Sequence, residues 1–239
     1  MNMSEEQHED YTIDVTPIRR TIAERTRRSL SEVPHAFMMM EADVTNLVRL
    51  RHAAKERFLQ QEGVALTYLP FLVNAVVCAI KEHPLMNSIY VNDKIMVKKD
   101  VNLSLLVGTE HAVWAPVLKQ ADRLSIAGLA IEIDKVTRKA REGRLKLEDL
   151  QGGTFTVNNT GSFGSISSYP TVNQPQAAIL TFESIVNKPV VLDEMIAVRS
   201  MVHLCLSLDH RILNGTVCGS FLQSVRGNLE NIQLNTQLY

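Results

Sequence analysis

The spacing of apolar and polar residues divides the chain into a helix-rich first part and a strand-rich second part. Apolar residues at helical spacing predict helices over residues 18–30, 45–61 and 66–83, the last of which is apolar on most sides. Thr16 and Pro17 are typical of an N-cap and a first helical position. We therefore expect the third helix in the core and the first one, which is rich in arginine, at the surface.

Short strand patterns dominate from residue 89 onward. Residues 89–99 read as two strands around an Asn92-Asp93 turn, and 195–211 fits either one long strand or two joined by a bend. Further strands are predicted over residues 35–44, 101–108, 113–118, 152–159 and 176–185, and further helices over 126–141 and 216–230. Helices and strands in this order indicate an α/β layered domain. No internal repeat or interdomain linker interrupts residues 12–239, which we expect to be one domain.

Composition narrows the class of protein. The chain has 239 residues, three cysteines and a formal net charge of −1, which argues against a nucleic-acid binder and against a disulfide framework. Residues 1–11 are acidic and without periodicity, so we expect a disordered linker remnant there. The start has no signal-peptide pattern, and the apolar run 69–80 is too short to cross a bilayer. We expect a cytoplasmic protein that binds no membrane.

His210 is the residue best placed for chemistry. It ends an apolar strand and precedes a turn containing Asn214-Gly215, and a strand end can hold a reactive side chain rigidly. The neighbouring Asp209 points to the opposite face of the strand, so it is not expected to orient the imidazole. The alternative is a capping or core histidine; His203, in the same strand, shows that such histidines occur without a catalytic role.

Motifs of other enzyme classes are absent from the sequence. It has no GxSxG nucleophile elbow, no GxxxxGK[ST] phosphate loop and no GxGxxG after a strand. The histidines and cysteines lack the spacing of metal ligands, so we expect no metal site. By pattern alone, the chain is an α/β protein with one well-placed histidine.

Several longer segments agree with one family. They are TPIRRTIAERTRRSLSEVPH, LPFLVNAVVCAIKEHP, KAREGRLKLEDLQGGTFTVNNTGSFGS, NQPQAAIL and LSLDHRILNG. In this order they resemble the catalytic domain of dihydrolipoamide acyltransferases, the core component of 2-oxo acid dehydrogenase complexes. The resemblance runs from about residue 13 to the C-terminus, and bacterial branched-chain members are the most similar.

The resemblance implies a chloramphenicol acetyltransferase-like fold, with a mixed β-sheet flanked by helices. Family members form homotrimers, which build a 24-subunit cube or a 60-subunit dodecahedron. The active site then lies between two subunits, where acyl-dihydrolipoamide and coenzyme A meet. His210 matches the histidine of the family motif His-x-x-x-Asp-Gly, the general base that takes the proton of the coenzyme A thiol.

Two asparagines depart from the expected family pattern. Asn158 falls on a serine or threonine position that donates to the oxyanion, and an amide can do the same; the alternative is a turn or strand-end amide. Asn214 stands where the motif has aspartate, which in the family pairs with an arginine of the first helix. Arg19 is the best match for that arginine, with Arg20 as the alternative. Gly215 completes the motif and gives structural support.

The function implied is transfer of a branched-chain acyl group from S-acyl-dihydrolipoamide to coenzyme A. An alternative is a catalytically impaired scaffold subunit, which the two asparagines favour and His210 opposes. An antibiotic acetylase of the same fold is a third interpretation. The chain has no lipoyl-attachment segment, so the lipoamide is expected on a separate lipoyl domain. Decarboxylase and dihydrolipoamide dehydrogenase are the further partners expected.

Overall fold

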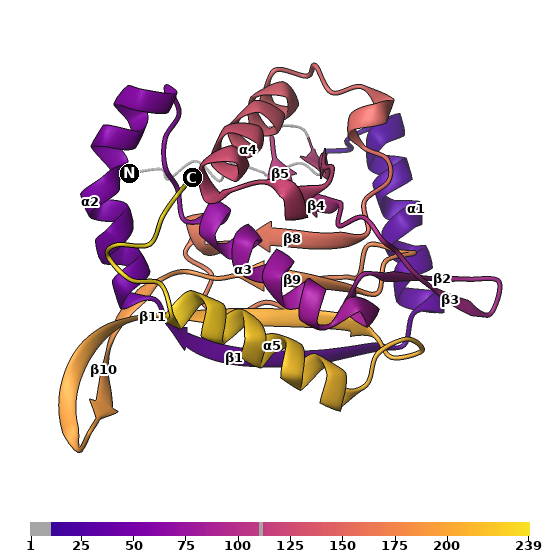
Figure 1. The fold of residues 1–239 in the computed structure, drawn as a ribbon. Helices are drawn as coiled ribbons and strands as arrows, with labels where there is room; N and C mark the ends of the chain where they lie inside the picture. Colours follow the sequence, from indigo (N-terminus) through magenta and orange to yellow (C-terminus); the bar gives the residue numbers. More distant parts are fainter. Residues whose placement is uncertain (1–10, 110–111) are drawn as a thin grey trace, which may run out of the picture.

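A seven-stranded mixed sheet forms the centre of the computed structural model, which describes residues 11–109 and 112–239 (Figure 1). Its strand order is β1-β11-β9-β8-β4-β7, and β10 pairs with β11 beside this path. Strand β8 runs parallel to β4 and β9, whereas the other pairs are antiparallel. The strands are β1 (His35–Asp43), β4 (Leu103–Leu105), β7 (Val117–Leu118), β8 (Phe155–Asn159), β9 (Ala178–Phe182), β10 (Val186–Leu192) and β11 (Met195–Asp209).

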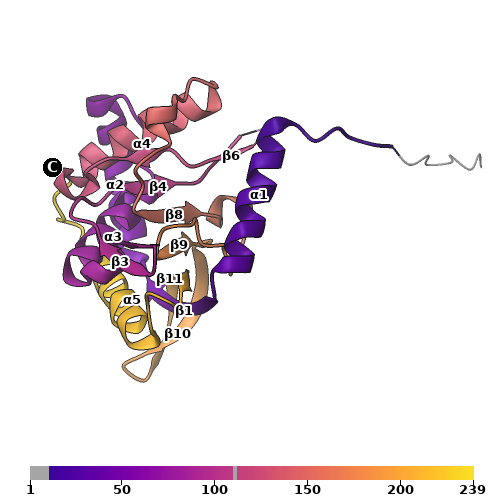
Figure 2. The ribbon, with the colours of Figure 1, turned by 90° about the vertical axis from the view of Figure 1, so that its right-hand side faces the viewer.

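Helices cover both faces of this sheet unequally. Helices α2, α3, α4 and α5 lie on one side of the sheet, and α1 lies on the other (Figure 2). The helices are α1 (Pro17–Glu32), α2 (Thr45–Glu62), α3 (Leu69–Glu82), α4 (Ile126–Arg141) and α5 (Gly215–Glu230). All but one residue of the apolar part of α3 from Pro70 to Val77 is buried, as its sequence predicts. The expected layered α/β fold with a mixed sheet is confirmed.

The two-residue period of β11 separates the faces. Its even-numbered residues from Val202 to Leu208 join the main hydrophobic core beneath the helices. The odd-numbered residues from His203 to Asp209 point to the opposite face. Burial of the apolar side fixes the register, because a one-residue slip would expose every core side chain of the strand. The same register therefore fixes where β11 ends and where His210 begins the turn.

Most predicted elements are confirmed, with small shifts of their ends. Thr16 caps α1 by accepting the N–H of Arg19 at 3.3 Å, and residues 89–99 form β2 (Ser88–Val91) and β3 (Lys94–Val97). Residues 101–108, predicted as one strand, form two short strands, β4 and β5 (Val107–Gly108). Residues 113–118 likewise form two, β6 (Val113–Trp114) and β7. Strand β11 is continuous, which settles the alternative left open by its sequence.

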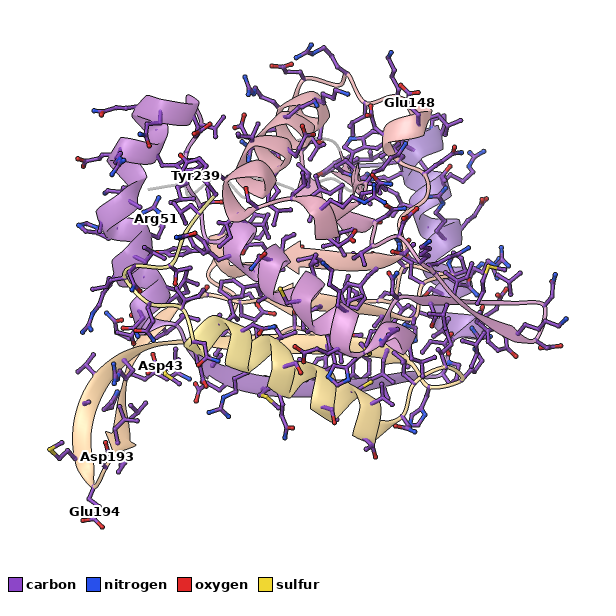
Figure 3. The ribbon with its side chains drawn as sticks, in the orientation of Figure 1. Asp43, Arg51, Glu148, Asp193, Glu194 and Tyr239 are labelled. Carbon is purple, nitrogen blue, oxygen red and sulfur yellow. The ribbon has the colours of Figure 1, made fainter. Side chains whose placement is uncertain are left out.

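The strand β10 is the element that the sequence did not predict. Pro189 lies in its middle, and its turn to β11 is Asp193-Glu194, which has positive φ values of 48° and 64° but lacks the usual glycine. The resulting hairpin projects from the sheet, with Asp193 and Glu194 at its tip (Figure 3). Four of its apolar residues are more than two-thirds exposed: Val191, Met195, Ile196 and Val198.

Four expectations concern regions or properties outside the sheet. Residues 1–10 of the expected linker remnant lie outside the described residues, and Tyr11 is exposed. None of the helices in the described part of the chain is long and apolar enough to span a bilayer. The cytoplasmic location and the single-domain boundary at residue 12 stay predictions.

Candidate active site

His210 occupies the first position after β11, as predicted. Its backbone N–H donates to the carbonyl of Pro34 at 3.0 Å, which ties the start of the turn to the residue before β1. The side chain is exposed, and its ring has no hydrogen-bond partner within residues 11–109 and 112–239. The exposure excludes the core-histidine alternative. The imidazole is therefore held by its backbone and free to contact a ligand or a second molecule.

Asp209 is committed to another partner, so it does not orient His210. It is 1% exposed and accepts two hydrogen bonds from Arg211 Nε, at 3.0 and 3.2 Å, and one from Arg211 Nη2 at 2.6 Å. The hydrogen-bonded Asp209 carboxylate raises the pKa of the Arg211 guanidinium above its ordinary value. The sequence expectation that Asp209 and His210 point apart is consistent with this pairing.

Asn214 is the N-cap of α5. Its side-chain oxygen accepts the N–H of Val217 at 3.0 Å, which satisfies one of the unpaired donors of the first helical turn. Gly215 follows at the first helical position, where a Cβ would meet nothing within 4 Å. The structure thus gives Asn214 a local structural role and shows no steric need for glycine at 215.

The structure does not bring Arg19 to Asn214 within one chain. Arg19 lies in the first turn of α1, and no ion pair or hydrogen bond joins its side chain or that of Arg20 to Asn214 in the described ranges. Helix α1 contacts the segment between β8 and β9 through its far end, where the Ser29 hydroxyl donates to the Val172 carbonyl at 2.7 Å. Ten helical residues separate Arg19 from that contact, which is about 15 Å.

Asn158 lies at the opposite end of the sheet from His210. It is half-buried near the end of β8 and pairs with Thr181, which in turn pairs with Cys205 of β11. His210 comes five residues after Cys205, so the two candidates are separated by about 17 Å along the strand direction. Among the described residues, the Asn158 side chain has no hydrogen-bond partner. Within one chain, the side chains of His210 and Asn158 are therefore too far apart to contact the same reacting group.

A buried carboxylate, which no pattern in the sequence predicts, fixes the segment that follows Asn158. Glu183, 1% exposed at the end of β9, accepts hydrogen bonds from Thr160 Oγ1 at 2.6 Å and from Ser168 Oγ. Burial raises the pKa of Glu183, but these hydroxyl donors outweigh it and hold the pKa below its ordinary 4.5. Gly161 is required here, because a Cβ would lie 2.5 Å from the Glu183 carbonyl oxygen.

Two of the three cysteines are poorly suited to a second reactive centre. Burial raises the pKa of the Cys218 thiol to about 11, and burial also raises that of Cys205, so both are poor nucleophiles at neutral pH. The described residues hold no group of three or more histidine, cysteine, aspartate or glutamate side chains arranged for a metal ion.

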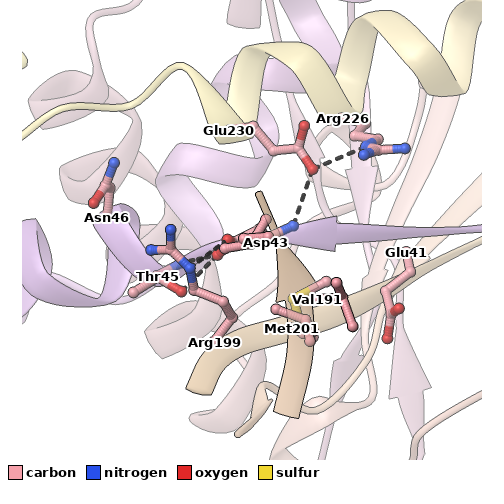
Figure 4. A pocket seen from close by; sticks show the side chains of 11 residues that line it. Glu41, Asp43, Thr45, Asn46, Val191, Arg199, Met201, Arg226 and Glu230 are labelled. Atoms are coloured by element: carbon pink, nitrogen blue, oxygen red, sulfur yellow. Dashed lines mark hydrogen bonds and ion pairs between the residues drawn. The ribbon is translucent and has the colours of Figure 1, made fainter. Parts of the chain in front are cut away.

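A cavity of 520 Å³, which none of the candidate residues lines, lies at the base of the β10–β11 hairpin (Figure 4). Its charged residues largely satisfy one another: Arg199 lies 3.4 Å from Asp43, and Glu230 accepts from both Arg226 and the Asp43 N–H. In register, Asp43 and His210 belong to opposite ends of the β1–β11 pair. The cavity is therefore at the end of this strand pair far from His210.

The sheet and helices define the class of fold. The structure resembles chloramphenicol acetyltransferase with a TM-score of 0.55 and 13% identity, over 91% of this chain and 98% of that one. A family model for the 2-oxoacid dehydrogenases acyltransferase (catalytic domain) matches residues 7–236. The chain belongs to this family.

Individual relatives agree with this assignment. The chain is 53% identical over 231 residues to the lipoamide acyltransferase component of the branched-chain alpha-keto acid dehydrogenase complex of Bacillus subtilis, covering 96% of this chain and 54% of that protein. It thus spans about half the length of this curated relative. A probable dihydrolipoamide acetyltransferase from Listeria monocytogenes has a TM-score of 0.94 and 49% identity, over 96% of this chain and 99% of that one.

A third relative bears on the asparagines. The dihydrolipoamide acetyltransferase of Azotobacter vinelandii has a TM-score of 0.91 and 31% identity, over 94% of this chain and 93% of that one. Its structure belongs to an investigation of a serine, a histidine and an asparagine in its catalytic mechanism. Those three follow one another at the same intervals as Asn158, His210 and Asn214 here. An asparagine four residues after the histidine is therefore no departure from that relative.

Proposed function

We propose that this chain is the acyltransferase domain that moves an acyl group from S-acyl-dihydrolipoamide to coenzyme A. The observation that carries the proposal is the placement of His210 and Asn158 at opposite ends of one sheet. In the sequence, the two are as far apart as the serine and the histidine of the Azotobacter vinelandii investigation. Both side chains are without partners in one described chain. A second copy that sets its Asn158 beside His210 completes the site.

The proposed reaction needs one base and one oxyanion donor. His210 takes the proton of the coenzyme A thiol, and the thiolate attacks the carbonyl carbon of the acyl thioester. The Asn158 amide of the neighbouring copy donates a hydrogen bond to the oxyanion of the tetrahedral intermediate. The intermediate then collapses: the bond to the lipoyl sulfur breaks, and the proton on His210 goes to that sulfur. The product is acyl-coenzyme A, and the imidazole returns to its neutral state.

The family also implies lipoamide, which we propose is brought to the site on a separate lipoyl domain. The acyl group that we propose is branched. The support is the identity to the Bacillus subtilis branched-chain component, 53%, against 38% to the succinyltransferase of the same organism and 41% to a mycobacterial acetyltransferase. Steady-state rates with isobutyryl-, acetyl- and succinyl-dihydrolipoamide test this choice. A higher kcat/KM for either of the latter two overturns it.

We propose a homotrimer as the smallest active unit, closed further into a cage. Two features support association: the projecting β10–β11 hairpin with its exposed apolar residues, and the incomplete site in one chain. A relative with a TM-score of 0.91 was solved as the cubic core of a pyruvate dehydrogenase complex. Light scattering after size exclusion measures the mass; an active monomer contradicts the proposal. Decarboxylase and dihydrolipoamide dehydrogenase are the other partners proposed.

The alternative of a catalytically impaired scaffold subunit is now favoured by one asparagine instead of two. It rested on Asn158 and Asn214, and the acetyltransferase of Azotobacter vinelandii has an asparagine at the interval of Asn214 in work on its catalytic mechanism. Replacement of His210 by alanine separates the two functions, because a scaffold without catalysis shows no drop in acyl transfer.

A further inference from the structure

The residues before and after His210, Asp209 and Arg211, are hydrogen-bonded to each other. Asp209, the last residue of β11, is almost fully buried, and the Arg211 guanidinium folds back to it with three side-chain hydrogen bonds. The backbone N–H of Arg211 also donates to Asp209 Oδ1, at 3.0 Å. This closed ring spans only residues 209–211. The conformation of the residue between them is therefore restricted from both ends.

A third residue anchors this ring to another part of the fold. The Arg211 Cζ lies 4.3 Å from the ring centroid of Tyr90, a distance at which a cation attracts the face of an aromatic ring. Tyr90 itself is fixed: its hydroxyl donates to Asp93 at 2.8 Å, and its N–H donates to the Pro175 carbonyl at 3.2 Å. The β2–β3 hairpin thus forms a support for the end of β11.

His210 depends on this support more than a buried residue would. Its side chain is exposed and makes no hydrogen bond within the described residues, so neither packing nor a partner side chain orients the ring. Its backbone is held by the Pro34 carbonyl on one side and by the Asp209–Arg211 ring on the other. The N–H groups of Ile212 and Leu213, each 3.0 Å from the Asp209 carbonyl, close the same turn without fixing the Arg211 side chain. A flat guanidinium is needed for this geometry, because it pairs with a carboxylate through two nitrogens while it stacks on an aromatic face.

We propose that Arg211 is a positioning residue for His210: stacked on Tyr90 and paired with Asp209, it fixes the turn that aims the catalytic imidazole. The inference rests on the proposed function, since His210 must be the base. Arg211 touches no reacting atom in this proposal. It acts through the backbone of the residue before it.

The test compares kinetic constants of the assembled protein for Arg211→Lys, Tyr90→Leu and Tyr90→Phe. Lysine keeps the charge but loses the paired and stacked geometry, so we expect kcat to fall about tenfold to a hundredfold, as for a misplaced catalytic group. We expect the KM for coenzyme A to stay within about twofold, because substrate binding is not changed. Tyr90→Leu lowers kcat in the same direction, and Tyr90→Phe, which keeps the ring, lowers it less.

A structural role alone would give a different result. It would lower the melting temperature or the assembled fraction and leave kcat per assembled site unchanged. Arg226→Lys is the matched control, because Arg226 forms an ion pair with Glu230 on a distant part of the molecule. The pH dependence of kcat/KM adds a second readout: since Arg211→Lys keeps the charge, the apparent pKa should not move while the plateau falls.

Three outcomes overturn the inference: wild-type kcat in Arg211→Lys, a raised KM with kcat unchanged, or equal losses in Tyr90→Phe and Tyr90→Leu. The raised KM would mean that Arg211 binds substrate directly. His210→Ala in the same assay distinguishes a failure of the positioning role from a failure of the proposed function. If His210→Ala is inactive and Arg211→Lys is normal, only the positioning role fails; if His210→Ala is fully active, the proposed function fails as well.

Discussion

Asn158 and His210 lie at opposite ends of one sheet, with Asn158 linked through Thr181 to a residue of β11 five positions before His210. A strand spans about 3.3 Å per residue, so no side-chain rotation closes this gap. The arrangement has a simple consequence. If both residues act in one reaction, they must come from different copies of the chain.

Mixing two inactive variants tests this consequence. His210→Ala and Asn158→Ala each remove one half of the site, and each alone should have little activity. Co-expressed copies that assemble at random should regain about a quarter of the wild-type sites, since one interface in four then joins an intact His210 to an intact Asn158. The measurement is the rate per copy in co-expressed and separately purified samples.

Samples purified separately and combined without exchange of subunits are the control. If co-expression restores nothing although mixed oligomers are shown by mass spectrometry, each site is built from one chain and the proposal of a shared site is wrong.

Replacement of His210 should remove general-base catalysis. We expect His210→Ala to lower kcat by about a hundredfold to ten-thousandfold, because proton transfer to a positioned base contributes this much. The KM values should change less than kcat. His52→Ala is the control, since His52 is exposed on α2 and is assigned no role here. Equal rates for the two variants would contradict a catalytic His210.

Asn214 should matter first for the stability of α5. Asn214→Ala removes the N-cap oxygen that accepts from Val217, so we expect a loss of about 0.5–2 kcal/mol of unfolding free energy. Asn214→Asp keeps an acceptor and adds a negative charge at a helix N-terminus, so it should unfold at the same temperature or a higher one. Thermal unfolding of the three proteins measures the difference.

Asn214 precedes glycine, a sequence that deamidates readily, so intact-mass analysis must accompany each Asn214 sample. If Asn214→Ala and Asn214→Asp melt together, the cap does not contribute. Activity of Asn214→Asp equal to that of the wild type would show that the reaction accepts either side chain.

Glu183 predicts an acid-sensitive contribution to stability. Hydroxyl donors lower its pKa in the folded protein against the opposing effect of burial, so the folded state favours the carboxylate. That stability is present at neutral pH and is lost as the pH falls through about 4.5 and below. Glu183→Gln should therefore be less stable at pH 7 and should show a smaller decrease toward pH 4.

Denaturant unfolding at pH 7, 5 and 4 measures this dependence. Glu148→Gln is the control, because Glu148 is largely exposed and its ion pair with Lys146 spans 3.9 Å. A pH dependence in Glu183→Gln as steep as in the wild type would exclude the carboxylate as its source.

Much of the scaffold, and the place of His210 within it, could be predicted from the amino-acid sequence. Helical and two-residue periodicities predicted the helices and most strands, because burial of an apolar face imposes those periods. The end of the apolar run at Leu208 placed His210 at a strand end. Resemblance over several segments supplied the fold and the family, both of which are confirmed.

How these residues are placed relative to one another depends on contacts between segments that are far apart in the sequence. The order of the strands along the chain does not determine their direction or register in the sheet. The separation of Asn158 from His210 therefore follows only from the pairing of β8, β9 and β11. The long-range contacts of Glu183 and Tyr90 were invisible for the same reason. The strand β10 was missed because its local pattern is weak and its stability comes from pairing with β11. Periodicity depends on residues that are close in the sequence, so it can be recognised without the structure. A site consists of residues that are distant in the sequence and come together only when the chain folds.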